Sequence, residues 1–174
     1  MGVEARLADL GLALPPVLAA EAPVRIPFEW ARVVGDRVLL SGHGALDPEG
    51  RPCPPFGRVP GEVPLEDAQA SARRAGLALI ASLRRAIGDL DRVQAWTMVN
   101  GFVNADPGYG QTTAVLNPLS DLLLDVFGDV GQHARTAIGV GALPLNLPVI
   151  ASAEVVIAAV TDPDPPWGID QRDR

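Results

Sequence analysis

Arg135 is the residue whose type and position most strongly indicate chemistry. It leads into residues 136–140 (TAIGV), whose small and β-branched side chains predict a buried strand. A charge that loses its water without gaining a partner is costly, and the planar guanidinium suits a carboxylate. We therefore expect Arg135 to meet the carboxylate of another residue or of a ligand. The alternative is a surface arginine that is ion-paired or solvated at the end of a strand.

The composition removes several classes of catalysis. All 14 basic residues are arginine, so no lysine amine can form a Schiff base, hold pyridoxal phosphate covalently or serve a P-loop. The single cysteine, Cys53, excludes an internal disulfide and a cysteine-built metal site. Two histidines, His43 and His133, are too few for a three-histidine zinc site. We therefore expect no metal and no cofactor.

Charge and hydropathy narrow the set of partners. The net charge of −7 disfavours nucleic acid, because phosphate binding depends on clustered positive charge. No window holds the roughly 18 uncharged apolar residues of a membrane span. The first residues are acidic and lack the pattern of a secretory signal. We expect a cytoplasmic protein that binds neither nucleic acid nor membrane.

The sequence also predicts the helices and strands that position Arg135. The first half of the chain indicates a hairpin, a long loop and a helix. Residues 28–34 and 37–42 flank a Gly-Asp turn and indicate a β-hairpin. The Gly- and Pro-rich residues 42–63 predict a long loop that is functional or lies over an interface. Residues 64–87 carry an apolar stripe at helical spacing, and Gly88 follows as a stop signal.

The second half predicts three strands and one helix. Residues 93–104 alternate as in a central strand, and residues 135–142 and 149–160 predict the two closing strands. Between them, Asn117 and Pro118 are typical of an N-cap followed by the first residue of a helix. The order of elements predicts an α+β domain, with a mixed sheet and two helices on one of its faces.

The predicted domain spans residues 24–160. Residues 1–23 form an N-terminal extension with a short helix, and the Pro-rich, acidic residues 161–174 form a tail. Alternation within the central strand places Trp96, Met98 and Phe102 on one strand face. One chain supplies nothing to cover that face, so we expect an oligomer.

The run from Gln132 to Pro144, QHARTAIGVGALP, resembles the signature of the RidA/YjgF (Rid) family. The resemblance covers about residues 24–160 and implies the chorismate-mutase-like α+β fold. It also implies a homotrimer with sites between subunits. In this family, the arginine that Arg135 matches binds the carboxylate of a 2-imino or 2-enamino acid.

Further positions carry the resemblance residue by residue. Phe28 follows a proline where the family has a tyrosine, so a hydroxyl is lost. Ser41 and Gly42 match a Ser-Gly pair after the second strand, and His43 follows them in place of glutamine. Asn117 matches the asparagine that leads the second helix. Ala137 stands where archetypal members have a cysteine. The resemblance implies that these positions line the site.

The closing strand departs from the family pattern. Imine-hydrolysing members carry a glutamate there that positions the attacking water, and Ile150 occupies its place. A branched alkane can neither hold nor deprotonate water. Ser152 replaces the next glutamate of the pattern, and Glu154 lies four residues after Ile150, about 13 Å from it along the strand. The chain is therefore identified as a divergent member that lacks the imine-hydrolase glutamate.

Two main hypotheses follow. In the first, the protein acts on small imine- or enamine-type carboxylates as a specialised deaminase, tautomerase or cyclase. Arg135 then binds the carboxylate, Ser41 and Asn117 orient the reacting group, and His43 or His133 transfers protons. The alternative for each histidine is a structural role. In the second hypothesis, the trimer binds a carboxylate metabolite at Arg135, with Phe28 and Ile150 as apolar walls, without turning it over. An RNA-directed role is a third hypothesis, which the acidic composition opposes.

Overall fold

The computed structural model describes residues 2–18 and 25–159, which are organised around one five-stranded sheet. The strands are β1 (Ala31–Val34), β2 (Arg37–His43), β3 (Val93–Asn104), β4 (Ala134–Val140) and β5 (Val149–Ile157). They lie in the order β1-β2-β5-β3-β4, and only β3 and β4 run parallel to each other. The sheet is therefore mixed, and β4 is one of its two edge strands.

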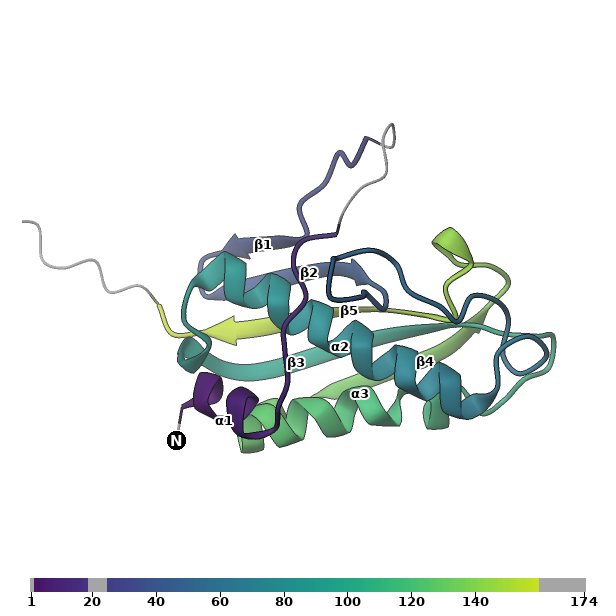
Figure 1. Cartoon of the computed structure of the whole chain (residues 1–174). Helices are drawn as coiled ribbons and strands as arrows, with labels where there is room; N and C mark the ends of the chain where they lie inside the picture. Colours follow the sequence, from purple (N-terminus) through teal and green to yellow (C-terminus); the bar gives the residue numbers. More distant parts are fainter. Residues whose placement is uncertain (1, 19–24, 160–174) are drawn as a thin grey trace, which may run out of the picture.

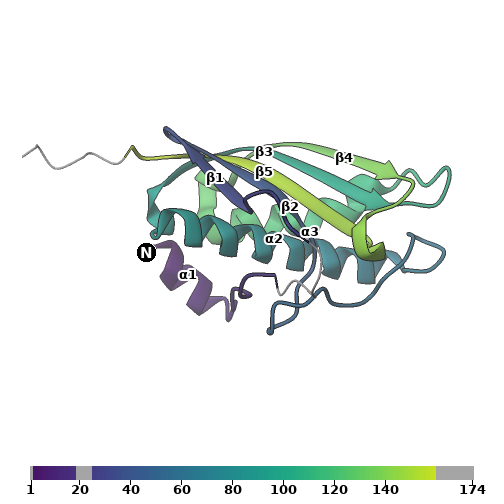
Figure 2. The same cartoon turned by 90° about the horizontal axis from the view of Figure 1, so that it is seen from above.

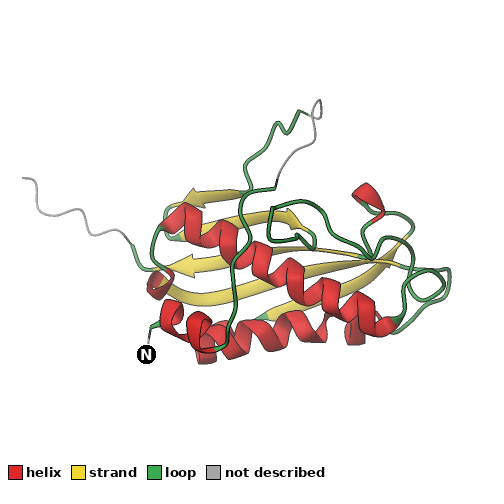
Figure 3. Ribbon diagram, in the orientation of Figure 1, coloured by secondary structure: helices red, strands yellow, loops and turns green. Residues whose placement is uncertain are grey.

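Two long helices cover one face of this sheet. α2 (Leu65–Ile87) and α3 (Thr112–Phe127) lie side by side in a single layer, as Figures 1 and 2 show from two directions. Figure 3 shows the red helix layer against the yellow sheet. Shorter elements are α1 (Val3–Asp9) and the 3-10 helices η1 (Leu90–Arg92), η2 (Gly128–Gly131) and η3 (Pro144–Asn146). The architecture confirms the predicted α+β class with two helices on one face.

Glycines allow the two layers to approach closely. A Cβ atom at Gly76 of α2 would come within 2.9 Å of the Leu122 side chain on α3. A Cβ atom at Gly101 of β3 would overlap the side chain of Leu116, which is fully buried. The core therefore fills the space between the helices and the central strands, and buried residues alternate along β5.

Simple alternation places Trp96 on the same strand face as Met98 and Phe102, and for Trp96 this prediction is wrong. The pairing of β3 with β5 shifts register between Trp96 and Met98, which marks a β-bulge. Trp96 turns toward the helices, where it is 1% exposed and packs against the ring of Phe127 at 5.4 Å. Met98 stays on the uncovered face of the sheet.

The predicted start of the second helix at Asn117 is also wrong. α3 begins at Thr112, so Asn117 and Pro118 lie inside the helix. Pro118 has no N–H group to donate to the carbonyl of Ala114, four residues earlier. Gln69 of α2 supplies the missing donor, because its Nε2 lies 2.9 Å from that carbonyl oxygen. A contact between two helices therefore replaces the hydrogen bond that the proline removes.

The short helix predicted in the N-terminal extension is present as α1. Its Leu7 is buried in the core, and Nη1 of Arg6 donates to the carbonyl of Val126 near the end of α3. The following arm runs along the outer side of the helix layer (Figure 2). Residues 19–24 and the predicted tail 161–174 lie outside the described residues. In the described part of the chain, no helix is both long and apolar enough to cross a membrane.

The face of the sheet opposite the helices is bare in one copy of the chain (Figure 2). It exposes apolar side chains from three strands, namely Leu39 at 43%, Met98 at 36% and Ile138 at 46%. Large apolar side chains exposed on one face of a sheet are typical of a surface that a protein partner covers. The prediction that further copies of the chain cover it therefore keeps its physical basis.

Candidate functional site

Arg135 lies near the start of the edge strand β4, and its side chain is directed toward α3. In the ladder with β3 it pairs with Val99, which is fully buried beneath the helices. Paired residues in a ladder share a face of the sheet, so Arg135 lies on the helix side. Its side chain is half-buried at the border between the sheet edge and the helix layer.

Three neutral oxygen atoms of α3 accept hydrogen bonds from the Arg135 guanidinium. Nη1 donates to Ser120 Oγ at 2.8 Å, and Nη2 donates to Asn117 Oδ1 at 2.9 Å. Nη2 also donates to the backbone carbonyl of Thr113 at 3.3 Å. Residues 113, 117 and 120 are spaced so that they lie on one face of a helix. The guanidinium is thus held in place without being neutralised.

His133 extends this set of hydrogen bonds. Its Nδ1 lies 2.7 Å from the carbonyl oxygen of Gly131, so Nδ1 carries the proton and donates. In the neutral ring, Nε2 is then an acceptor, and it lies 2.9 Å from Ser120 Oγ. Ser120 therefore accepts from Arg135 and donates to His133, so each polar group has a role consistent with its neighbours.

The pKa of Arg135 is lowered by burial, and the charge of Asp121 acts in the opposite direction. An arginine nevertheless stays protonated at neutral pH. Within residues 2–18 and 25–159, no carboxylate forms an ion pair with Arg135. Of the two partners expected for Arg135, the carboxylate of another residue is thus not found among the described residues. Neutral oxygen atoms contact the guanidinium instead. Nε–H and one Nη1–H of the guanidinium keep no acceptor among those residues.

His43 lies in the core, not beside Arg135. It is 5% exposed, its Nδ1 donates to the carbonyl of Ser41 at 2.6 Å, and its Nε2 accepts from Ser82 Oγ at 2.7 Å. Arg85 donates in turn to Ser82 Oγ at 2.8 Å. Burial is the main cause that lowers the pKa of His43 to about 4. With both ring nitrogens bonded inside the protomer, this geometry favours the structural alternative over acid–base catalysis.

Ser41 and Gly42 lie on β2 and Phe28 precedes β1, whereas Arg135 lies on β4 at the other edge of the sheet. β2 is separated from β4 by β5 and β3, a distance of about 14 Å at the usual strand spacing. Ser41 Oγ donates to the carbonyl of Glu29 at 2.7 Å, and Phe28 is 52% exposed. One copy of the chain therefore does not bring these residues to the guanidinium.

Ile150 lies on the uncovered face of the sheet. It pairs with Phe102, and a Cβ atom at Gly42 would lie 3.0 Å from its Cγ2. Ile150 and Gly42 are therefore neighbours on one face, whereas Arg135 is on the other. Glu154, also on β5, pairs with Arg37, whose Nε lies 2.8 Å from its Oε1. Glu154 is thus engaged elsewhere and does not take over the position of Ile150.

Ala137 lies two residues after Arg135 on β4 and contacts α3 through its backbone. Its carbonyl oxygen accepts a hydrogen bond from Thr112 Oγ1 at 2.9 Å, which ties β4 to the first turn of α3. Residues 2–18 and 25–159 contain no cluster of three His, Cys, Asp or Glu side chains arranged to hold a metal ion.

Sequence reasoning missed Ser120 and the carbonyl of Thr113. Thr113 lies before Asn117, so it joins the helix only when α3 is extended back through Pro118. Ser120 lies within the predicted helix, but its contact with Arg135 depends on where α3 lies relative to β4.

Comparisons with known proteins agree with the fold and with the sequence signature. Residues 4–154 match the family model described as "YjgF/chorismate mutase-like, putative endoribonuclease". Protein TCP17 of Trypanosoma cruzi is 36% identical over 154 residues, which cover 88% of this chain and 92% of that protein. Both matches extend over most of the chain, and the family model includes Arg135.

Solved structures give the same fold at two levels of similarity. A structure from Shewanella oneidensis, described as "a putative endoribonuclease", has a TM-score of 0.81 and 28% identity. The match covers 90% of this chain and all (100%) of that one. RidA from Psychrobacter sp. has a TM-score of 0.54 and 24% identity over 81% of this chain and 94% of its own, which shows the fold alone. The chain therefore belongs to the YjgF/chorismate mutase-like (Rid) family, as a divergent member.

Proposed function

We propose that the protein binds a small carboxylate of the imine or enamine type at Arg135 and acts on it. The observation that carries this proposal is the state of the guanidinium. α3 holds it with Ser120, Asn117 and the carbonyl of Thr113, all neutral, and no carboxylate of the described residues pairs with it. A half-buried cation of this kind is suited to an anion that arrives from outside the chain.

The donors that remain on Arg135 fit a carboxylate. Nε–H and one Nη1–H have no acceptor among the described residues, and because they point to different sides of the guanidinium, each can donate one hydrogen bond to a carboxylate oxygen. Asn117 and Ser120 fix the plane of the guanidinium, so little freedom is lost when the ligand binds. Their role in this proposal is to position Arg135, and His133 positions Ser120.

The site is completed, in this proposal, by a neighbouring copy within a homotrimer. Arg135 stands at a sheet edge, whereas Ser41, Gly42 and Ile150 belong to other strands of the same copy. A second copy that packs against this edge would bring its own Ser41 and Gly42 to the ligand. The bare apolar face with Leu39 and Met98 supports such an association.

A non-catalytic binding module is the second candidate, and Ile150 favours it. The side chain at this position offers neither a proton acceptor nor a hydrogen bond to water. Glu154 is held by Arg37 and does not substitute for a missing base. The trimer would then bind the carboxylate and release it unchanged. Cleavage of RNA, which the family description names, is opposed by the net charge of −7.

A turnover assay distinguishes an enzyme from a non-catalytic binding module. 2-Iminobutyrate is generated in situ with an amino-acid oxidase, and ammonia release is measured with and without the protein. An enzyme accelerates ammonia release above the buffer rate. Arg135→Ala abolishes the acceleration, and the control variant Arg73→Ala, changed on the exposed side of α2, retains it.

Calorimetric titration with 2-oxobutyrate, a stable analogue, measures binding alone. Binding that depends on Arg135 without acceleration supports the module, and absence of both overturns the carboxylate proposal.

A further inference from the structure

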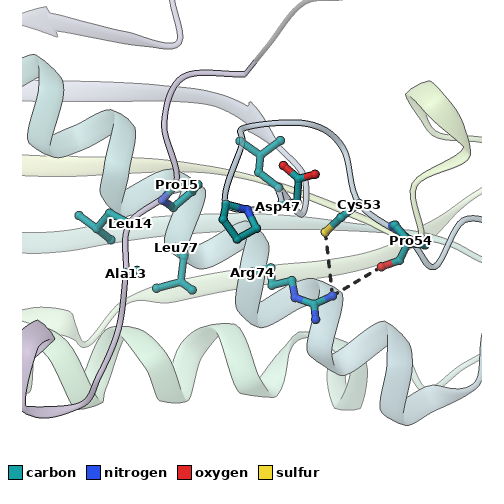
Figure 4. A pocket seen from close by; sticks show the side chains of 10 residues that line it. Ala13, Leu14, Pro15, Asp47, Cys53, Pro54, Arg74 and Leu77 are labelled. Carbon is teal, nitrogen blue, oxygen red and sulfur yellow. Dashed lines mark hydrogen bonds between the residues drawn. The ribbon is translucent and has the colours of Figure 1, made fainter.

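A hollow lies on the outer side of the helix layer, away from the sheet. It is formed by the N-terminal arm, by the loop between β2 and α2, and by the outward side of α2 (Figure 4). Its volume is about 510 Å³, which lies within the range of small-molecule sites. Arg135 contributes nothing to its lining, so this hollow is distinct from the candidate site on β4.

The walls of this hollow are mainly apolar. Leu14 and Pro15 come from the arm, Leu46 and Pro54 from the loop, and Leu77 from α2. The arm is fixed to the helix layer, because Arg85 donates to the carbonyl of Pro15 at 3.3 Å. The loop is fixed by its own hydrogen bonds, including Cys53 N to the carbonyl of Ala45 at 3.2 Å. The hollow is therefore preformed in the folded chain.

Two charged side chains line the hollow, and their states differ. The Asp47 carboxylate accepts from the backbone N–H groups of Glu49 and Arg51 and from Arg51 Nε, at 2.8 to 2.9 Å. These bonds, led by the one from the Arg51 backbone, hold the pKa of Asp47 below its usual range. Asp47 is thus fully engaged within its own loop and adds little to ligand binding.

Arg74 has only weak partners. Its Nη1 lies 3.9 Å from Cys53 Sγ and 3.5 Å from the carbonyl oxygen of Pro54, and Figure 4 shows both contacts across the hollow. Within the described ranges of the chain, no carboxylate forms an ion pair with it. The neighbouring Arg73, by contrast, lies 4.0 Å from Asp125. Arg74 therefore presents a positive charge beside an apolar cavity.

We infer that this hollow is a second ligand site, which binds a small amphiphilic acid, with the apolar part against Leu14, Leu46 and Leu77 and the carboxylate on Arg74. The apolar walls account for affinity through buried surface. The guanidinium accounts for preference of an acid over a neutral molecule of the same length. Because Arg74 is exposed, this preference is modest, about 1.5-fold to fivefold in dissociation constant.

The test is calorimetric titration of the full-length protein with octanoate and with octanol. Wild type binds octanoate about 1.5-fold to fivefold more tightly than octanol. Arg74→Ala removes this preference, and Arg73→Ala, its matched control, keeps it. Arg135→Ala also keeps it, which separates the hollow from the candidate site on β4. Leu77→Trp fills the hollow and abolishes binding of both probes, while circular dichroism and thermal unfolding verify the fold of every variant.

The single cysteine of the chain reports where the probe binds. Cys53 lines the hollow, so bound octanoate slows its alkylation by iodoacetamide, with the same concentration dependence as the calorimetric signal. Three outcomes would overturn the inference. The first is that wild type does not bind octanoate. The second is that Arg74→Ala prefers octanoate over octanol as strongly as wild type does. The third is that octanoate binding is lost in Arg135→Ala and kept in Leu77→Trp.

Discussion

The side-chain oxygen of Asn117 lies 2.9 Å from Nη2 of Arg135, and this contact joins the middle of α3 to the edge strand β4. The amide holds the guanidinium and leaves its charge intact. A carboxylate at the same position would hold it equally well and would cancel that charge. In the proposed function, an amide at this contact instead of an acid leaves the charge of Arg135 available to an external anion.

Asn117→Asp tests this relationship with almost no change in shape. The new carboxylate pairs with Arg135 and competes with the ligand, so the dissociation constant for 2-oxobutyrate rises about tenfold or more. Calorimetric titration measures it. Asn117→Ala is the matched control, in which loss of one hydrogen bond weakens binding only severalfold. Equal affinity in Asn117→Asp and wild type would contradict the proposed role of the uncompensated charge.

Ser120→Ala tests the hydrogen bonds behind the guanidinium. Nη1 of Arg135 loses an acceptor and Nε2 of His133 loses a donor, so binding of 2-oxobutyrate weakens by about threefold to tenfold. Ser71→Ala is the control, because the buried Ser71 hydroxyl has no hydrogen-bond partner among the described residues. That change leaves the affinity unaltered. A similar loss in both variants would show a general effect on packing instead.

His43 makes the stability of the fold depend on pH. Its pKa is lowered from 6.5 to about 4 in the folded chain, so below pH 6.5 the unfolded chain binds a proton that the folded chain does not. Stability is therefore greatest above pH 6.5 and falls by on the order of 3 kcal/mol as the pH drops toward 4.

Urea unfolding at fixed protein concentration, repeated between pH 7.5 and pH 4.5, measures this dependence. His43→Gln keeps a polar side chain but cannot titrate, so its free energy of unfolding should change less over the same interval. The carboxylates contribute the same background in both proteins. A pH dependence that is identical in wild type and His43→Gln would exclude the buried neutral imidazole.

Gln69 and Pro118 are predicted to be coupled in stability. Gln69→Ala leaves the carbonyl of Ala114 without a donor and destabilises the fold by about 1 to 3 kcal/mol. In a Pro118→Ala background, the restored N–H satisfies that carbonyl, so the cost of Gln69→Ala is smaller. A double-mutant cycle by urea unfolding measures the coupling. Simple additivity of the two changes would contradict this explanation of the proline.

Much of the fold follows from the sequence because its signals are local. The strand predicted at residues 93–104 has the same bounds in the structure. The hairpin, α2 and the stop at Gly88 agree as well, except that β1 begins at Ala31 instead of residue 28. Apolar periodicity and glycine stops depend on nearby residues, which a single sequence contains. These elements sufficed to predict the α+β class.

The errors come from interactions between distant segments. Asn117 and Pro118 carry the local signature of a helix start, but Gln69 on another helix allows α3 to continue through them. Trp96 departs from simple alternation because β3 bulges against β5, and pairing partners are invisible in the periodicity of one strand. Ser120 was missed for the same reason, since its part in the site depends on where α3 lies relative to β4.

The most direct test of the central claim is a crystal structure of the protein with 2-oxobutyrate bound. The account predicts that the ligand carboxylate accepts a hydrogen bond from Nε or Nη1 of Arg135, at a boundary between copies, with Gly42 of a neighbouring copy within reach. Asn117 and Ser120 should keep their hydrogen bonds to the guanidinium. A ligand bound elsewhere, or an Arg135 paired with an Asp or Glu of the protein itself, would contradict it.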